Sequence, residues 1–138
     1  MIISQIETIR VAQFPDLIFV QVHTDTGLTG LGETWYAAST VESAIHDHFG
    51  PLLVGRDPFE IERHWQTMFR LSDHAGYGGA ELRAISAIDV ALWDIKGQSL
   101  NMPIFEIIGG GTRNRIKVYN TLGVYGEIDE AHKVLSLI

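Results

Sequence analysis

The residues with the chemistry of a metal site are His46, Asp47 and His48, which stand side by side. Histidines two positions apart do not share a helix face, so the two rings would not converge on one ion. The His-Glu-x-x-His pattern of zinc peptidases does not occur in the sequence. We therefore interpret this run as a solvated helix end.

Acidic residues offer a second chemistry, because two carboxylates can share acid–base work. Asp89 and Asp94 lie in one long apolar segment, but they are five positions apart and would point to different helix faces. We expect them to pair with Arg83 or Lys96, or to accept hydrogen bonds from loop backbone. Glu33 is interpreted in a similar way, as a partner in a salt bridge or at a helix start.

Two glycine-rich stretches have the composition of ligand-binding loops without their patterns. Gly109-Gly110-Gly111 precedes Thr112 and Arg113, but no Gly-x-Gly-x-x-Gly and no Gly-Lys-Ser/Thr motif occurs. A helix C-terminus that leads into a crossover explains the triple glycine. Residues 74–79 fit a mobile loop over a site and a simple turn equally well.

Composition excludes several classes of protein. The 138 residues carry a net charge of −7, with 46% hydrophobic residues and no cysteine. This balance predicts a folded domain and argues against nucleic-acid binding, which needs a basic face. Without cysteine there are no disulfides and no thiolate metal sites. Because no signal peptide and no apolar run of about 18 residues is found, we expect a cytoplasmic protein without membrane attachment.

The first third of the chain has the pattern of three strands. Ile2–Val11 is rich in β-branched residues, and Leu17–Thr24 alternates apolar and polar residues with a period of two. Leu28–Glu33 carries two glycines at alternate positions, which allow a close approach to the backbone or mark a bulge. Phe14–Asp16 and Asp25–Gly27 are expected to separate the strands. The pattern predicts an antiparallel meander.

Helical spacing begins at Ser39. Ser39 and Glu42 have the spacing of a capping box, in which each side chain satisfies a backbone N–H group of the other residue. A second helix is predicted to begin with Asp57 as its N-cap and Pro58 at its first position. The apolar stripe of the first helix consists of Val41, Ala44, Ile45, Phe49 and Leu52.

The longest predicted helix is Ala80–Ser99, and apolar residues occupy more than half of its circumference. Such a helix is expected at the centre of the domain, with its alanines letting neighbours approach closely. A short helix is predicted over Pro103–Ile108. A strand at Ile116–Thr121 and a helix at Glu127–Ile138 then form one βα unit, which needs parallel neighbours to pair with.

The sequence Ala-Ile-Asp-Val-Ala-Leu-Trp-Asp-Ile-Lys-Gly at residues 87–97 resembles a signature of the enolase superfamily, in its mandelate racemase and muconate-lactonizing branch. The resemblance extends along nearly the whole chain. It includes Gly30-Leu31-Gly32-Glu33 upstream and, downstream, Pro103 and the glycines of 109–111. Tyr119-Asn120-Thr121 is most similar to the acid-sugar dehydratases of that branch, such as galactonate dehydratases.

The resemblance implies an α+β fold in two parts. Residues 1–114 would be a capping domain, with a three-stranded antiparallel meander followed by a helical bundle. Residues 115–138 would be the first βα unit of an incomplete β/α barrel. The implied parent enzyme uses Mg²⁺ to stabilise the enediolate formed when a base removes the proton α to a carboxylate. It would be a dehydratase or racemase of hydroxy acids or acid sugars, and a homo-oligomer at full length.

In such an enzyme the metal ligands and the bases lie on barrel strands that this chain lacks, so no catalytic residue and no metal ligand is assigned here. Two capping-domain loops would line the pocket for a small carboxylate substrate. The first contributes Phe14, and the second contributes Trp35 and Tyr36, whose alternative role is packing against a neighbouring domain. Asn120 and Thr121 would stand at the pocket wall, where the first barrel strand ends.

Two other hypotheses stay open. A stand-alone module would recruit a partner through the surface that a barrel covers, and its mark would be a core that is filled without the barrel. A truncated, inactive fragment would expose a large apolar patch, dissolve poorly or associate through the strand at 116–121. We expect this last behaviour, without catalysis, from the isolated 138-residue chain.

Overall fold

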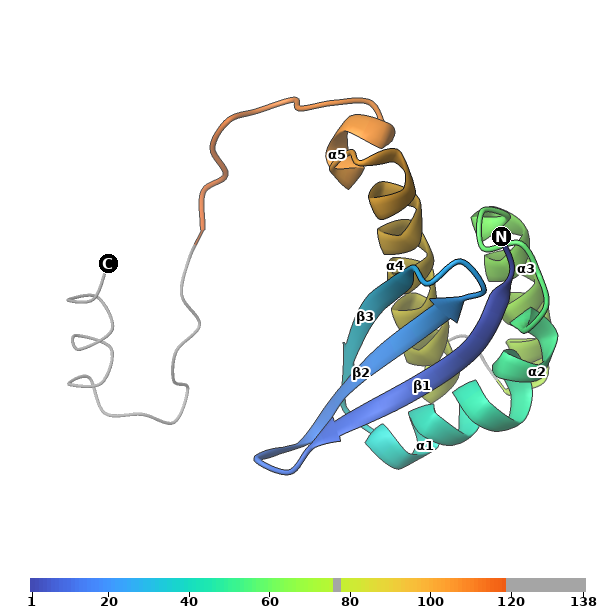
Figure 1. Cartoon of the computed structure of the whole chain (residues 1–138). Helices are drawn as coiled ribbons and strands as arrows, with labels where there is room; N and C mark the ends of the chain where they lie inside the picture. The colour runs from blue at the N-terminus through green and yellow to red at the C-terminus, as the bar shows by residue number, and fades with distance from the viewer. Residues whose placement is uncertain (76–77, 119–138) are drawn as a thin grey trace, which may run out of the picture.

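The structure is a computed structural model, and it describes residues 1–75 and 78–118. A three-stranded sheet comes first in the chain, and the helices that follow cover one of its faces (Figure 1). The α+β fold with a meander and a helical bundle is therefore confirmed. The predictions for Asn120, for Thr121 and for the helix at 127–138 lie outside the described residues.

The sheet is an antiparallel meander of β1 (Ile3–Val11), β2 (Phe14–Thr24) and β3 (Thr29–Trp35), in that order. Alternate residues of β2 face the helices, and this confirms the predicted period of two. The fully buried positions on this face of β2 are Ile18, Val20 and Val22. Among residues 1–75 and 78–118, no helix lies on the opposite face of the sheet (Figure 1).

The first hairpin is tighter than expected. Phe14 already pairs with Val11, so the segment that was predicted to break the chain is the beginning of β2. Pro15 is tolerated there because pairing between β2 and β3 starts only at Leu17, opposite Trp35. Because β3 does not pair with this part of β2, no hydrogen bond to β3 is lost through the N–H group that proline lacks.

The first helical segment consists of α1 (Ala38–Ser43), a π-helical segment η1 (Ala44–Phe49) and α2 (Gly50–Leu53). The predicted stripe is correct up to Phe49, but Leu52 is 38% exposed and Leu53 is buried in its place. Buried residues here recur at every fourth position, which is more than the 3.6 residues of an α-helical turn. The wider π turn accommodates this longer period.

The predicted capping box is wrong. The N-cap position of α1 is Ala37, and no side chain caps the helix. Arg10 of β1 engages both predicted capping residues instead. Its Nη2 donates to Ser39 Oγ at 2.8 Å and lies 2.8 Å from Glu42 Oε2. Ser39 and Glu42 therefore bind a cation of the sheet, and α1 has no side-chain cap.

Helix α3 (Ile61–Leu71) begins three residues later than the sequence predicted. Asp57 does not cap it, because its Oδ1 accepts a hydrogen bond from the backbone N–H of Phe59 at 2.9 Å. This is an Asx turn, in which the side chain stabilises the loop before the helix. Glu60 occupies the N-cap position. A 3-10 turn, η2 (Ser72–Ala75), follows α3.

Helix α4 (Ala80–Leu100) lies at the centre of the domain, as predicted, and packs against β3. Gly30 and Gly32 permit this contact. A Cβ atom on Gly32 would overlap the carbonyl oxygen of Ala87, and one on Gly30 would overlap that of Ala91. The buried face of α4 consists of Ala84, Ile85, Ala87, Ile88, Ala91, Leu92, Ile95 and Gly97. No helix in the described part of the chain is long and apolar enough to span a membrane.

The short helix α5 (Ile104–Ile107) ends at the triple glycine, as predicted. Gly109 and Gly110 have positive φ, and the N–H of Gly110 donates to the carbonyl of Phe105 at 2.7 Å. The predicted strand is wrong over Ile116–Val118, which have no regular structure. A barrel strand forms only beside a partner, and these three residues pair with no described strand.

Candidate functional site

The aromatic turn, defined here as residues Trp35–Ala37, lies where β3 ends and α1 begins. Tyr36 has φ 78° and Ala37 has φ 57°. The left-handed region costs an L-residue other than glycine about 1–2 kcal/mol. Two such residues in succession are a local strain that persists only where the surroundings fix it.

Two elements, a strand and a helix, hold the aromatic turn. The N–H of Tyr36 donates to the carbonyl of Asp16 in β2 at 2.9 Å. Arg83 of α4 donates from Nη1 to the carbonyl of Trp35 at 2.6 Å, and its Cζ lies 5.6 Å from the centre of the Tyr36 ring. The turn is therefore anchored from the sheet and from the central helix at once, with a cation–π contact added.

The aromatic side chains of this turn remain largely open to solvent. Trp35 is 53% exposed and Tyr36 is 61% exposed, while Phe14 at the start of β2 is 53% exposed. Because Trp35 lies opposite Leu17, the strand register brings all three to the same end of the sheet. The structure thus places the three predicted substrate-facing aromatics together at one end of the molecule.

Glu33 lies on the uncovered face of the sheet, two residues before Trp35 and opposite Phe19. Among the described residues it makes neither the salt bridge nor the helix-start hydrogen bond that the sequence predicted. It therefore presents a free carboxylate beside the aromatic end of β3.

Polar side chains of α4 cover the free edge of β3. Asp94 Oδ2 accepts hydrogen bonds from the N–H of Leu31 and from Gln98 Nε2, both at 2.9 Å. Gln98 Nε2 also donates to the carbonyl of Thr29 at 2.8 Å. Together with Arg83 on the carbonyl of Trp35, these contacts satisfy backbone groups that an edge strand leaves open. The prediction that Asp94 binds backbone is confirmed, although the backbone belongs to a strand.

Asp89 behaves differently from Asp94. Burial raises the pKa of its carboxyl, and the nearby negative charge of Glu62 raises it further. The predicted pairing with Arg83 or Lys96 is wrong within the described residues. Arg83 is bound to the aromatic turn, and Lys96 Nζ lies 5.0 Å from the centre of the Trp93 ring.

The described residues do not fit a Mg²⁺ centre. Magnesium needs several oxygen ligands around one point, and no group of three or more His, Asp or Glu side chains in this part of the chain is so arranged. His46 Nε2 instead lies 2.8 Å from Thr8 Oγ1, and Asp47 accepts a hydrogen bond from Ser43. This run lies inside the π-helical segment rather than at a helix end, which corrects the prediction of its place.

Comparisons with known proteins agree with this architecture. Residues 5–109 match the family of the mandelate racemase/muconate lactonizing enzyme N-terminal domain. A D-galactonate dehydratase from Variovorax paradoxus (strain S110) is 45% identical over 123 residues, covering 88% of this chain and 31% of that protein. One from Xanthomonas campestris pv. campestris (strain B100) is 44% identical over 111 residues, 79% of this chain and 28% of that protein.

Solved structures give the same result. An enolase of the mandelate racemase subgroup from Agrobacterium tumefaciens has a TM-score of 0.82 at 43% identity, covering 99% of this chain and 36% of that one. An enolase from Pantoea ananatis, solved with bound D-gluconate and Mg, has a TM-score of 0.71 at 37% identity. The match covers 81% of this chain and 28% of that one. The chain spans about three-tenths of the length of the curated relatives it matches.

Proposed function

Because the chain belongs to the mandelate racemase/muconate lactonizing enzyme family, through the N-terminal domain that residues 5–109 match, we propose that it is the substrate-capping part of an enzyme. That enzyme removes the proton α to a carboxylate, in the dehydration or racemisation of an acid sugar or another hydroxy acid. Residues 1–114 are the capping domain in this proposal, and 115–138 begin the barrel. The 45% identity to a D-galactonate dehydratase supports dehydration.

The observation that carries the proposal is the aromatic turn. Its backbone is strained and fixed by Asp16 and Arg83, whereas its two rings are exposed. Two aromatic side chains on a backbone that is fixed at the end of a sheet are suited to cover a polar substrate and to exclude water from it. Trp35 and Tyr36 are proposed to line the pocket, with Phe14 of the neighbouring hairpin.

The chemical step belongs to other residues in this proposal. Asn120 and Thr121 would add to the pocket wall, a role that only the family resemblance supports. Mg²⁺ would be held by residues outside the described ones, where it would neutralise the charge that develops on the carboxylate oxygens. The capping domain contributes recognition and closure, and none of its described side chains is assigned a proton transfer.

The test is a chimera in which residues 1–114 are joined to the remainder of the Variovorax paradoxus D-galactonate dehydratase. Formation of the keto acid from D-galactonate with Mg²⁺ is measured as kcat/KM. Trp35→Ala and Tyr36→Ala are each expected to lower kcat/KM about 10- to 100-fold, through lost closure over the substrate.

Val90→Ala is the matched control, because Val90 is an exposed apolar residue of α4 with 52% exposure and no proposed role in closure. Its kcat/KM is expected to equal that of the unaltered chimera. An active chimera in which both aromatic variants keep full kcat/KM would refute the capping role of this turn.

A second candidate function is an interaction module. One observation favours it, because the core closes within residues 3–95 of the described chain. Apolar side chains are exposed around α5 instead, namely Leu100, Met102, Phe105 and Ile108. An inactive chimera, together with a well-folded chain that binds a protein partner through these residues, would favour this function over the enzymatic one.

A further inference from the structure

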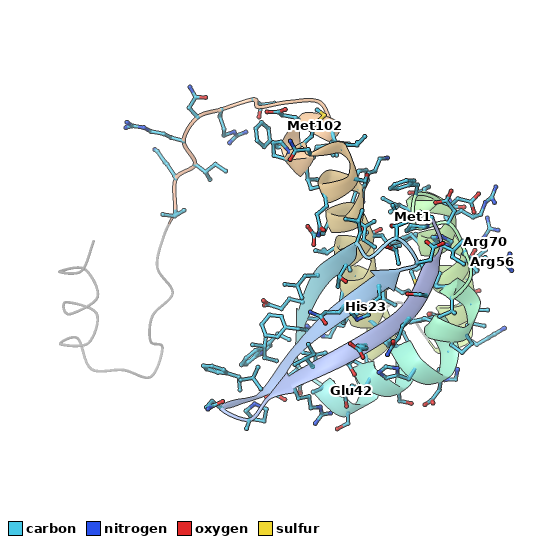
Figure 2. The ribbon with its side chains drawn as sticks, viewed as in Figure 1. Met1, His23, Glu42, Arg56, Arg70 and Met102 are labelled. Atoms are coloured by element: carbon cyan, nitrogen blue, oxygen red, sulfur yellow. The ribbon has the colours of Figure 1, made fainter. Side chains whose placement is uncertain are left out.

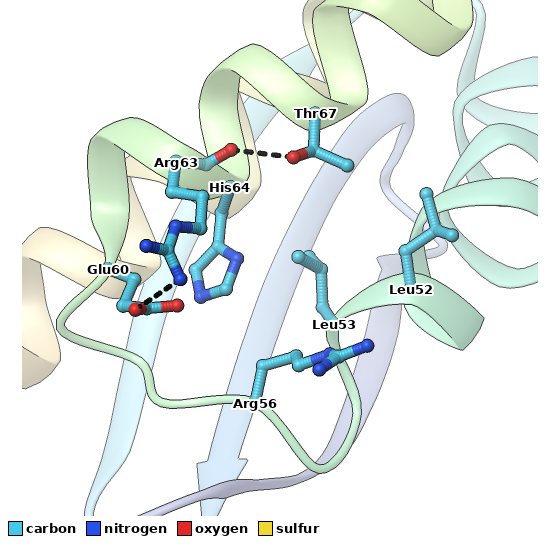
Figure 3. A pocket seen from close by; sticks show the side chains of 7 residues that line it. All are labelled: Leu52, Leu53, Arg56, Glu60, Arg63, His64 and Thr67. Atoms are coloured by element: carbon cyan, nitrogen blue, oxygen red, sulfur yellow. Dashed lines mark hydrogen bonds and ion pairs between the residues drawn. The ribbon is translucent and has the colours of Figure 1, made fainter.

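A hollow of about 310 Å³ lies between α2 and α3, and none of the predicted site residues lines it (Figure 3). This volume is at the lower end of the range for small-molecule sites, about 300–1,000 Å³. Its apolar side is formed by Leu52 and Leu53. Leu53 is 1% exposed, so the hollow reaches down to the hydrophobic core.

His64 lines the hollow and is itself only 4% exposed. Its Nε2 lies 2.7 Å from the carbonyl oxygen of Asp57. A carbonyl oxygen can only accept a hydrogen bond, so Nε2 carries the hydrogen. In a neutral imidazole the other nitrogen, Nδ1, is then an acceptor.

Nδ1 of His64 has no hydrogen-bond partner among the described residues. No described side-chain nitrogen or oxygen is both sealed from solvent and unpaired, so this nitrogen is open to solvent, and His64 lines the hollow. In Figure 3 the His64 ring lies between Arg63 and Leu53, with its second nitrogen turned toward the hollow. Nδ1 is therefore an unpaired acceptor in the hollow, and a ligand that donates a hydrogen bond would satisfy it.

Two guanidinium groups flank the hollow from different elements. Arg56 comes from the loop after α2 and has no side-chain partner within the described part of the chain. Arg63 of α3 uses Nη1 to contact Glu60 Oε1 at 2.6 Å, and it is 72% exposed. Guanidinium groups present paired donors that match a carboxylate, and here they do so in a chain of net charge −7.

We propose that this hollow binds a small hydroxycarboxylate. The carboxylate group is bound by Arg56, which lies on the side of His64 away from Arg63 and Glu60 (Figure 3). The hydroxyl group donates to Nδ1 of His64, and the carbon skeleton packs against Leu52 and Leu53. This site is separate from the aromatic turn and does not depend on the proposed function.

Isothermal titration of the 138-residue chain with lactate tests the proposal. We expect saturable binding with a Kd of about 1 mM, a typical affinity for so small a ligand. Propionate, which lacks only the hydroxyl group, is expected to bind about tenfold more weakly, because His64 Nδ1 then stays unpaired. Equal affinity for the two acids would overturn the assignment to His64.

Charge variants locate the site. Arg56→Gln is expected to weaken lactate binding about tenfold through loss of the bidentate contact. Arg70→Gln is the matched control, because Arg70 lies on the same side of the molecule (Figure 2) and bonds to Gln66 outside the hollow. Glu60→Gln should tighten binding, since it removes a negatively charged carboxylate from the lining of the hollow.

Circular dichroism verifies that each variant is folded before titration. Equal weakening by Arg56→Gln and Arg70→Gln would mean that lactate responds only to net charge, and the site would be refuted. Absence of saturable lactate binding to the folded chain would refute it as well.

Discussion

The contact between β3 and α4 allows a sharp test of how this domain is held together. A Cβ atom added to Gly32 would overlap the carbonyl oxygen of Ala87 and lie 2.8 Å from its carbonyl carbon. Carbon atoms in contact are ordinarily about 3.5–4.0 Å apart. Helix α4 would therefore have to move away from the sheet by more than half an ångström, because a backbone group cannot rotate aside as a side chain can.

The magnitude of this effect follows from the position of Ala87. It lies in the middle of the 21-residue α4, between Ile85 and Ile88, which are both fully buried. Displacing the helix would loosen contacts along this whole face. Overpacking a core costs about 1–3 kcal/mol and occasionally more, and a backbone obstacle at the central helix belongs at the upper end. We expect Gly32→Ala to lower the free energy of unfolding by at least about 3 kcal/mol.

The assay is urea unfolding of the 138-residue chain, followed by circular dichroism and tryptophan fluorescence with linear extrapolation. Gly27→Ala is the control, since Gly27 has φ +87° and no atom lies within 4 Å of the position that its new methyl group would occupy. That variant is expected to lose only about 1–2 kcal/mol, from the left-handed conformation alone. If Gly32→Ala costs no more than Gly27→Ala, the close approach of α4 is not what stabilises the sheet.

Three further predictions concern polar contacts of α4. Asp94→Ala should cost about 1–3 kcal/mol in urea unfolding, since the Leu31 amide loses its acceptor, and light scattering should detect association through the opened edge of β3; a monomer of unchanged stability would contradict this. The raised pKa of Asp89 means that the folded state binds the carboxyl proton more tightly than the unfolded chain does. Stability therefore falls as pH rises from the ordinary carboxyl pKa of the unfolded chain through the raised pKa of the folded state. Asp89→Asn should abolish this fall and raise the urea midpoint at neutral pH, and Glu62→Gln should do so in part; an unaltered pH profile would refute the assignment. Arg83→Ala should release the strained aromatic turn and increase its proteolytic cleavage several-fold, whereas cleavage at the wild-type rate would show that Arg83 does not hold it.

Local patterns predicted those parts of the fold that depend on neighbours in the sequence. The period of two in β2 identified the buried face of that strand. The apolar residues around most of the circumference of α4 indicated its central position, and the predicted end of the helix was one residue short. The triple glycine correctly marked the end of α5. The alternate glycines of β3 indicated either a close approach to the backbone or a bulge, and only the structure showed that α4 makes a close approach there.

Other features were decided by contacts between residues far apart in the chain. Arg10 binds Ser39 and Glu42, so a capping pattern that is sound by itself forms no cap. Leu53 replaces Leu52 in the core because the π-helical segment lengthens the period of the helix that packs beneath the sheet. No local propensity contains this information.

The candidate sites divide in the same way. From the sequence, the family resemblance assigned Trp35 and Tyr36 to a loop over the substrate, because they follow the Gly-x-Gly-Glu strand and lie beside a helix start. Only the tertiary structure showed that Arg83, 48 positions away, fixes their strained backbone. It alone brought Arg56 and His64 to one hollow, because a side chain of a loop and a side chain of a helix meet only when the chain between them has folded.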